Sequence, residues 1–260
     1  MQALTRDWGI MHTNHRSGEG SQLVFVNSLG TDLRMWDAVV AALPTDWACL
    51  RMDKRGHGLS ETAPPGYGIP ELASDVLAAM DQAAMDRAVI VGCSVGGLIA
   101  QHIALMAPER VDGLVLSNTA STLGAAEGWH TRIADVREHG MAAMAEGILP
   151  RWFGPKMLAD NKAFLWHTLL ARTCQEGYIA TCAAIAGTDI SDRLGEITQP
   201  TLVLGGKYDL ATPPEVIEAL AVNLPFACLV MFGDTGHLPA IEAPDAFTEA
   251  LTQFVERISE

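Results

Sequence analysis

Cysteine is scarce in this 260-residue sequence, and the few present are scattered without a C-x-x-C pair. An odd number of cysteines at irregular spacing in a chain of this length does not describe a disulfide framework. We interpret them as reduced thiols that serve mostly as small buried hydrophobic residues. The five are Cys49, Cys93, Cys174, Cys182 and Cys228.

Positive charge is also in short supply, with 17 lysines and arginines against 31 acidic residues and a net charge of −14. Nucleic acids and anionic membrane surfaces are bound by clustered basic residues, so both are disfavoured as partners. No apolar run reaches the ~18 residues of a membrane span, and the first residues lack the basic and apolar parts of a secretory signal. We expect a cytoplasmic protein.

Sequence motifs for metals and nucleotides are missing. The eight histidines include no H-E-x-x-H arrangement, and none has a partner set of Cys, Asp or Glu at ligand spacing. There is no G-x-G-x-x-G segment and no phosphate-binding loop. The sequence therefore predicts chemistry without a metal or cofactor.

Short apolar runs separated by segments of helical periodicity are what the sequence does contain. Leu72, Val76 and Met80 share one helix face, and the C-terminal residues 247–255 repeat this spacing. Alternating strands and helices predict an α/β fold with a mostly parallel sheet covered by helices on both faces. The predicted strands are residues 23–26, 48–52, 88–91, 113–116, 201–204 and 227–232.

The alternation stops between about residues 118 and 190, where helical periods continue without a strand. We predict a core formed by residues 1–118 and 191–260 and a helical cap formed by residues 119–190. Three of the six tryptophans, Trp129, Trp152 and Trp166, lie in this segment. They indicate either an apolar wall that covers a ligand or ordinary core packing.

A nucleophile is indicated by Gly92-Cys93-Ser94-Val95-Gly96, which follows one predicted strand and precedes a helical run. A serine on a sharp strand-to-helix turn exposes its hydroxyl above the sheet edge, beside the free N–H groups that begin the helix. Cys93 adjoins it, but we expect its side chain to point the opposite way. The prediction is that Ser94 is the nucleophile.

A serine hydroxyl needs a base and a group that orients the base. Asp209 follows the strand at 201–204 and His237 follows the strand at 227–232, so both lie at the sheet edge that carries Ser94. The chain order Ser, Asp, His is that of α/β-hydrolases. Asp234 is a possible rival acid, but it lies only three residues before His237, so Asp209 is preferred.

The negative oxygen that forms during acyl transfer needs two hydrogen-bond donors. We expect one to be the backbone N–H of Val95, directly after the nucleophile. The loop after the first apolar strand, Asn27-Ser28-Leu29-Gly30, offers the second, and we choose the N–H of Leu29.

On these residues the chain resembles the α/β-hydrolase family and, within it, the 3-oxoadipate enol-lactonases of the β-ketoadipate pathway. The resemblance runs nearly end to end, and its most specific part is the opening Asn-Ser-Leu-Gly-Thr-Asp of residues 27–32. The Arg-Gly-His-Gly and Gly-His segments are common to many relatives and discriminate weakly. The matching segments are residues 27–36, 53–60, 92–97 and 236–239.

The resemblance implies that Ser94 attacks the carbonyl of a five-membered enol lactone that carries a carboxylate, giving 3-oxoadipate. Such a substrate needs a local cation in this acidic protein. Trp129 and Arg132 are three residues apart, so on a helix they share a face and can offer an aromatic wall and a guanidinium. Three other arginines of the insertion compete for this role: Arg137, Arg151 and Arg172.

Two alternatives stay open at this point. One is a carboxylesterase or C–C bond hydrolase with the same triad and a different pocket. The other is a ligand-binding protein on the same fold, because fold alone does not fix function. In each case the expected partner is a small molecule.

Overall fold

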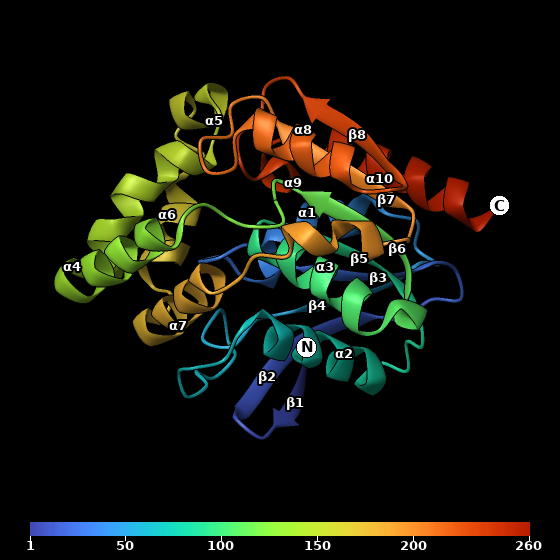
Figure 1. Ribbon diagram of the computed structural model, residues 1–260, viewed down its shortest axis with the longest axis horizontal. Helices are drawn as coiled ribbons and strands as arrows, with labels where there is room; N and C mark the ends of the chain where they lie inside the picture. Colours follow the sequence, from blue (N-terminus) through green and yellow to red (C-terminus); the bar gives the residue numbers. More distant parts are fainter.

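The computed structural model describes residues 1–260 and contains one eight-stranded sheet (Figure 1). Its spatial order is β1-β2-β4-β3-β5-β6-β7-β8. The pairs β1/β2 and β2/β4 are antiparallel, and every pair from β4 onward is parallel. The strands are β1 (Gln2–Arg6), β2 (Gly9–Arg16), β3 (Gln22–Val26), β4 (Ala48–Met52), β5 (Ala88–Cys93), β6 (Val111–Ser117), β7 (Thr201–Gly206) and β8 (Ala227–Phe232).

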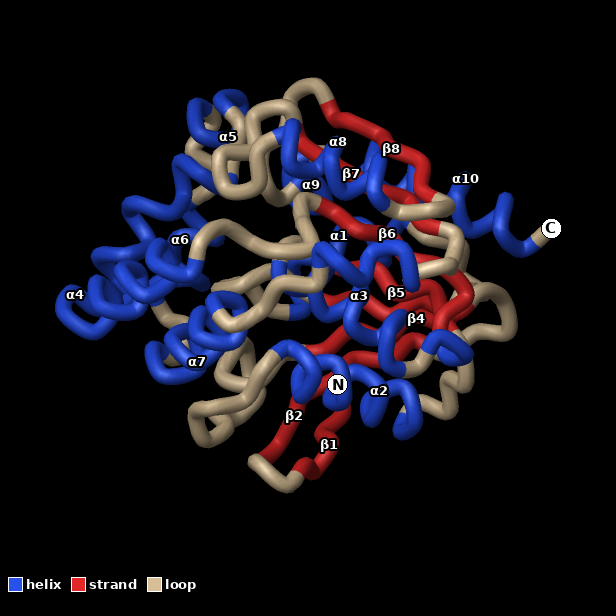
Figure 2. The backbone as a smooth tube through the Cα atoms, in the orientation of Figure 1, coloured by secondary structure: helices blue, strands red, loops and turns tan.

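Helices cover both faces of this sheet (Figure 2). Helices α2 and α3 contact each other on one face, where α8 also packs against β7 and β8, while α1 and α10 contact each other on the opposite face. The predicted α/β architecture is therefore confirmed. These helices are α1 (Asp37–Ala42), α2 (Ile69–Gln82), α3 (Val95–Met106), α8 (Pro214–Asn223), α9 (Pro239–Glu242) and α10 (Pro244–Ser259), with short 3-10 turns at Leu33–Trp36, Pro108–Arg110 and Ser191–Glu196.

The six predicted strands are all present, but the N-terminal hairpin β1–β2 was not predicted. Strand β2 carries His12, Thr13, Asn14, His15 and Arg16, and most of its side chains are only partly buried. An edge hairpin with one wet face lacks the continuous apolar run of a strand that is buried on both faces. For this reason its sequence lacks the apolar run from which the other strands were predicted.

Four helices and no strand lie between β6 and β7. They are α4 (Ala126–Trp152), α5 (Pro155–Ala159), α6 (Phe164–Ala171) and α7 (Gln175–Ala186), and α4 packs against both α6 and α7. Helix α4 is broken at Gly140, whose φ of 76° is not helical. Figure 1 shows these helices beyond the sheet edge where the parallel strands end. We propose that residues 119–190 form a cap on a core of residues 1–118 and 191–260.

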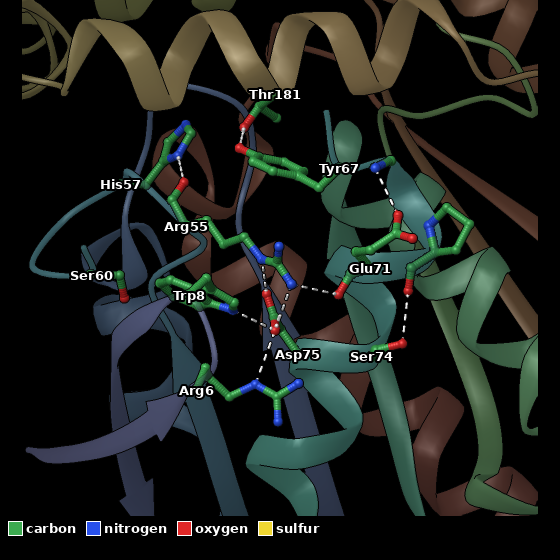
Figure 3. A network of polar contacts seen from close by, with 12 residues as sticks. Arg6, Trp8, Arg55, His57, Ser60, Tyr67, Glu71, Ser74, Asp75 and Thr181 are labelled. Atoms are coloured by element: carbon green, nitrogen blue, oxygen red, sulfur yellow. Dashed lines mark hydrogen bonds and ion pairs between the residues drawn. The ribbon is translucent and has the colours of Figure 1, made fainter. Parts of the chain in front are cut away.

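A buried polar cluster joins the N-terminal hairpin, the core and α7 (Figure 3). The Arg55 guanidinium lies 5.0 Å from the ring centroids of both Trp8 and Tyr67, and its Nε donates to Asp75 at 2.5 Å. The hydroxyl of Tyr67 is in turn 3.2 Å from that of Thr181 on α7. A cation between two aromatic rings and a paired carboxylate is a rigid support for the neighbouring loop and helix.

None of the helices combines the length and the apolar character that crossing a membrane requires.

Candidate active site

Ser94 occupies the turn between β5 and α3 with φ 57° and ψ −122°, a conformation that non-glycine residues rarely adopt. Two hydrogen bonds hold this backbone in place. The Ser94 N–H donates to the carbonyl of Ser117 at 2.9 Å, and the hydroxyl of Thr119 donates to the carbonyl of Ser94 at 2.7 Å. A strained residue that its surroundings fix in this way is a feature of functional sites.

Close approach of backbones explains why glycine follows this turn. A Cβ on Gly96 would lie 2.1 Å from the carbonyl oxygen of Val26, at the end of β3. The first turn of α3 therefore packs directly on the strand that leads into the loop of Leu29. Only a residue without a side chain permits this contact.

Asp209 and His237 meet at the same sheet edge. Nδ1 of His237 lies 2.8 Å from Oδ2 of Asp209, and both side chains are buried. The other oxygen of Asp209 accepts from the N–H groups of Ala211 and Thr212, at 2.7 and 2.8 Å. The rival Asp234 is exposed and makes no hydrogen bond to His237. The structure thus brings together the acid and the base that the strand ends predict.

Ser94 and His237 face a common cavity of about 320 Å³. Asp209 occupies Nδ1 of His237 and leaves Nε2 for a partner in the cavity. No direct hydrogen bond joins Ser94 to His237 in this structure, and in enzymes without substrate this contact is often long. The arrangement can take a proton from a serine hydroxyl once a substrate is in place.

Of the two predicted oxyanion donors, one lines this cavity and the other directly follows Ser94, which lines it. Leu29 lines it, and the N–H of Leu29 has no hydrogen-bond partner within the protein. Val95 is the first residue of α3, so its N–H has no carbonyl to bond within the helix. Gly30, next to Leu29, has a φ of 72°, and a Cβ there would lie 2.4 Å from Cδ1 of Leu170 in α6. The loop therefore lies directly beneath the helical insertion.

Trp129 and Arg132 share a face of α4, as their spacing predicts. The guanidinium of Arg132 lies 5.0 Å from the centroid of the Trp129 ring, and both residues line the cavity. Arg151 also lines it and donates to the carbonyl of Leu210 at 3.1 Å. Two of the four candidate arginines therefore reach the cavity, whereas Arg137 and Arg172 do not line it.

Of the three tryptophans in the insertion, two form part of a cavity wall and one belongs to the packed core. Trp129 and Trp152 line the cavity together with Tyr178 of α7, so they form an aromatic wall. Trp166 is buried among other apolar residues and does not line it. Ordinary packing accounts for Trp166.

Two further polar residues hold the site, and sequence reasoning did not find them. Asn118, with a φ of 51°, donates from Nδ2 to Oδ2 of Asp209 at 2.8 Å and to the carbonyl of Gly236 at 3.1 Å. The available signal was an asparagine directly after a buried strand, a residue that tolerates a left-handed backbone. Glu242 accepts from the N–H groups of Gly154 and Gly236, both at 2.7 Å. Burial raises the pKa of Glu242 to about 7, and these hydrogen bonds oppose the shift.

Cys93 takes no part in the cavity. Its Sγ points toward the carbonyl of His237, 3.7 Å away, and the side chain is buried. Burial raises the pKa of the Cys93 thiol far above its usual range, so the reactive thiolate is strongly disfavoured. Cys49 and Cys182 are buried as well, whereas Cys228 is partly exposed and Cys174 is exposed.

A mostly parallel eight-stranded sheet, a serine on the turn after β5, and an acid and a histidine after β7 and β8 define the α/β-hydrolase fold. The sequence pattern of the alpha/beta hydrolase family matches residues 23–250. The chain belongs to this family.

Several individual members of the family are similar to this chain over nearly its whole length. The chain is 32% identical to 3-oxoadipate enol-lactonase 2 of Acinetobacter baylyi, over 98% of this chain and 96% of that protein. It superimposes on the enol-lactonase from Burkholderia xenovorans LB400 with a TM-score of 0.91 and 36% identity, over 95% of this chain and 96% of that one. A thermophilic esterase from Thermogutta terrifontis gives a TM-score of 0.92 at 26% identity, over 99% of both chains. The fold and the hydrolase class are therefore shared with enol-lactonases and with esterases.

Proposed function

We propose that this protein hydrolyses 3-oxoadipate enol-lactone to 3-oxoadipate, a step of aromatic catabolism, in the cytoplasm. The observation that carries the proposal is one cavity lined both by Ser94 and His237, the latter bonded to Asp209, and by the Trp129–Arg132 pair. A small cyclic ester with a carboxylate matches both sets of residues. The enol-lactonase names of two full-length relatives support this substrate.

In the first half of the proposed reaction, Nε2 of His237 accepts the proton of the Ser94 hydroxyl as its oxygen attacks the lactone carbonyl. The N–H groups of Leu29 and Val95 stabilise the negative oxygen of the tetrahedral intermediate. Asp209 holds the imidazole in the required tautomer and stabilises its positive charge. Collapse of the intermediate breaks the ring C–O bond, and the enolate leaves and takes the proton from His237.

In the second half, His237 accepts a proton from water, which attacks the ester formed on Ser94. Collapse of this second intermediate returns the proton to Ser94 and releases the second carboxylate of the product. No step needs a metal or a redox group. The enol formed in the first half, when the enolate takes the proton from His237, becomes the ketone of 3-oxoadipate by tautomerisation.

The substrate carboxylate sits against the Arg132 guanidinium in this proposal. Arg132 packs on the Trp129 ring, which limits its rotamers and fixes the direction of its donors. Arg151 also lines the cavity and adds positive potential there, while one of its N–H groups donates to the carbonyl of Leu210. A guanidinium that is already oriented costs less entropy on binding than a free one.

A carboxylesterase acting on another small ester is the second candidate, favoured by the close superposition on the thermophilic esterase. The two are separated by following loss of the ultraviolet absorbance of the enol lactone, beside a nitrophenyl ester, with wild type and Ser94→Ala. Rapid Ser94-dependent turnover of the lactone is the expected result. Turnover of the ester without turnover of the lactone would support Ser94 as the nucleophile but contradict the proposed substrate. No turnover of either compound would favour a binding protein.

A further inference from the structure

Lys54 is a buried cation directly behind the loop of Leu29. It follows β4, it is 4% exposed, and its Nζ forms no ion pair with a carboxylate. Instead Nζ donates to two backbone carbonyls, that of Ser28 at 2.9 Å and that of Asn27 at 3.1 Å. Burying an ammonium group without a direct counter-ion is costly, so its presence here calls for a physical reason.

The carbonyl of Ser28 is the point where several donors converge. Besides Lys54, the hydroxyl of Thr31 donates to it at 2.9 Å and the N–H of Thr31 at 3.3 Å. This carbonyl belongs to the same peptide group as the N–H of Leu29. The protein has no cis peptide bonds, and in a trans peptide the carbonyl and the N–H point in opposite directions. Fixing the oxygen toward Lys54 therefore fixes the Leu29 N–H on the other side.

The other side is the cavity. Ser28 and Leu29 both line it with Ser94, and the Leu29 N–H is the donor of that peptide without a partner. The preceding N–H, that of Ser28, is already directed at the sulfur of Met35, 3.4 Å away. Lys54 thus holds the peptide whose donor remains available to a ligand.

The groups around Lys54 leave its charge directed at this peptide. The two carboxylate oxygens of Asp53 accept hydrogen bonds from the N–H groups of Leu33 and Leu59, at 2.8 and 2.9 Å. Burial lowers the pKa of Lys54 to about 7, so the amine carries its charge below about pH 7, while the charges of Asp53 and Asp32 and the nearby Cys93 thiol oppose the shift. Burial and the charge of Lys54 also lower the pKa of His57 well below its usual range, so this neighbour is neutral.

We propose that Lys54 is a positioning residue that orients the Ser28–Leu29 peptide and polarises its N–H as an oxyanion donor. The ammonium draws electron density toward the Ser28 oxygen, which increases the positive charge on the Leu29 hydrogen. The more positive Leu29 hydrogen stabilises the transition state, in which the substrate oxygen is negative, more than it stabilises the bound substrate. Loss of the Lys54 charge should therefore lower kcat. The inference rests on the proposed function, since it assigns Leu29 the oxyanion role.

Lys54→Met tests the proposal, because methionine has a similar length and no charge. Losing a whole oxyanion donor costs on the order of 100- to 1,000-fold in kcat. Because the N–H itself remains in Lys54→Met, we expect a smaller loss of roughly 10- to 100-fold, with KM changed less than about twofold. Lys156→Met, on the exposed surface of α5, makes the same change in net charge and is expected to keep wild-type kinetics.

A tetrahedral inhibitor separates polarisation from simple anchoring of the loop. Phenylboronic acid forms a tetrahedral adduct with an active serine, and we expect its inhibition constant to rise in Lys54→Met by about the factor that kcat loses. A purely structural role predicts instead a lower melting temperature with kcat and KM disturbed together. That pattern, or an unchanged kcat, would overturn the proposal.

A second variant keeps the test valid if Lys54→Met does not fold. Thr31→Val removes a neutral donor from the same carbonyl with little change in shape, so we expect a smaller fall in kcat, roughly two- to tenfold. An unchanged kcat in Thr31→Val would then count against the proposal. Ser94→Ala is run alongside: if it retains activity the proposed function fails, whereas its inactivity beside a fully active Lys54→Met sinks the Lys54 assignment alone.

Discussion

The side-chain amide of Asn118 donates to Oδ2 of Asp209 at 2.8 Å, the same oxygen that lies 2.8 Å from Nδ1 of His237. Asp209 therefore has a full set of partners, with two backbone N–H groups on its other oxygen. A carboxylate held on four sides cannot rotate away from the imidazole. The direction of the His237 ring is thus determined from β6 and from the loop after β7.

Removing the Asn118 amide is expected to loosen this arrangement. We predict that Asn118→Gly and Asn118→Ala both lower kcat roughly 10- to 100-fold, because a hydrogen bond to a charged group is worth about 1.5–3 kcal/mol. Glycine adopts a φ of 51° at lower cost than alanine, so Asn118→Ala is expected to be less stable than Asn118→Gly by about 1 kcal/mol. Steady-state kinetics and urea unfolding of both variants separate the two effects. Wild-type kcat in Asn118→Gly would contradict the role of the amide.

Strain at Ser94 makes a prediction about stability. With φ 57° and ψ −122°, this position favours glycine, and such strain costs on the order of 1–3 kcal/mol. We expect Ser94→Gly and Ser94→Ala to be equally inactive, with Ser94→Gly more stable by roughly 1–2 kcal/mol. Urea unfolding at neutral pH measures the difference. Equal stabilities would mean that the backbone at this turn is not strained in solution.

Arg132 is expected to control the affinity for a carboxylate-bearing substrate. We predict that Arg132→Gln raises KM for the enol lactone roughly 10- to 100-fold, the equivalent of one charge-assisted hydrogen bond. KM for an uncharged nitrophenyl ester is expected to change little. Arg137→Gln, on the same helix and exposed, is the matched control. A similar rise in KM for both substrates would refute the carboxylate contact.

Glu242 predicts a dependence of stability on pH. Its pKa in the folded protein is about 7, above the ordinary value of 4.5, so the folded protein holds a proton that the unfolded chain has released. The stability from that proton is complete below about pH 4.5 and is lost as the pH rises through about 7. Relative to Glu242→Gln, wild type is therefore expected to lose free energy of unfolding between pH 5 and pH 8. Urea titrations across this range test it.

The control for this prediction is Glu256→Gln, an exposed position on α10. Its stability curve should run parallel to that of wild type. If the curve of Glu242→Gln also runs parallel, the carboxyl of Glu242 titrates at its ordinary pH in the folded protein.

Local signals sufficed for the strands that build the site. The strands β5, β7 and β8 contain no charged residue, and the candidate residue that follows each one lies at the same edge of the sheet. Ser94, Asp209 and His237 could therefore be placed from the order of the strands and loops alone. The N-terminal hairpin lacked such a signal because water covers part of it. An apolar pattern in the sequence identifies a helix or strand only where at least one of its faces is shielded from water.

Residues that act through other residues could not be found in this way. In the sequence, Lys54 is part of a loop segment that many relatives share, and nothing marks it as special. Its contact with Ser28 joins two positions that are 26 residues apart and lie after the neighbouring strands β4 and β3. Asn118 likewise reaches a partner 91 positions away. The sequence favoured Arg132 by its spacing from Trp129 and left three competing arginines, and only the packed structure shows that Arg132 and Arg151 line the cavity whereas Arg137 and Arg172 do not. These contacts depend on how distant segments pack.

The cavity has a floor and a roof of different origin. Ser28, Leu29, Ser94 and His237 come from loops at the sheet edge, whereas Trp129, Arg132, Trp152 and Tyr178 come from one uninterrupted stretch between β6 and β7. In the proposed reaction, bond cleavage therefore depends on the core loops and substrate choice depends on the insertion. A replacement for that stretch could admit a different molecule, but it would have to keep two backbone contacts, because the carbonyl of Trp152 accepts from the N–H of His237 at 2.8 Å and the N–H of Gly154 donates to Glu242.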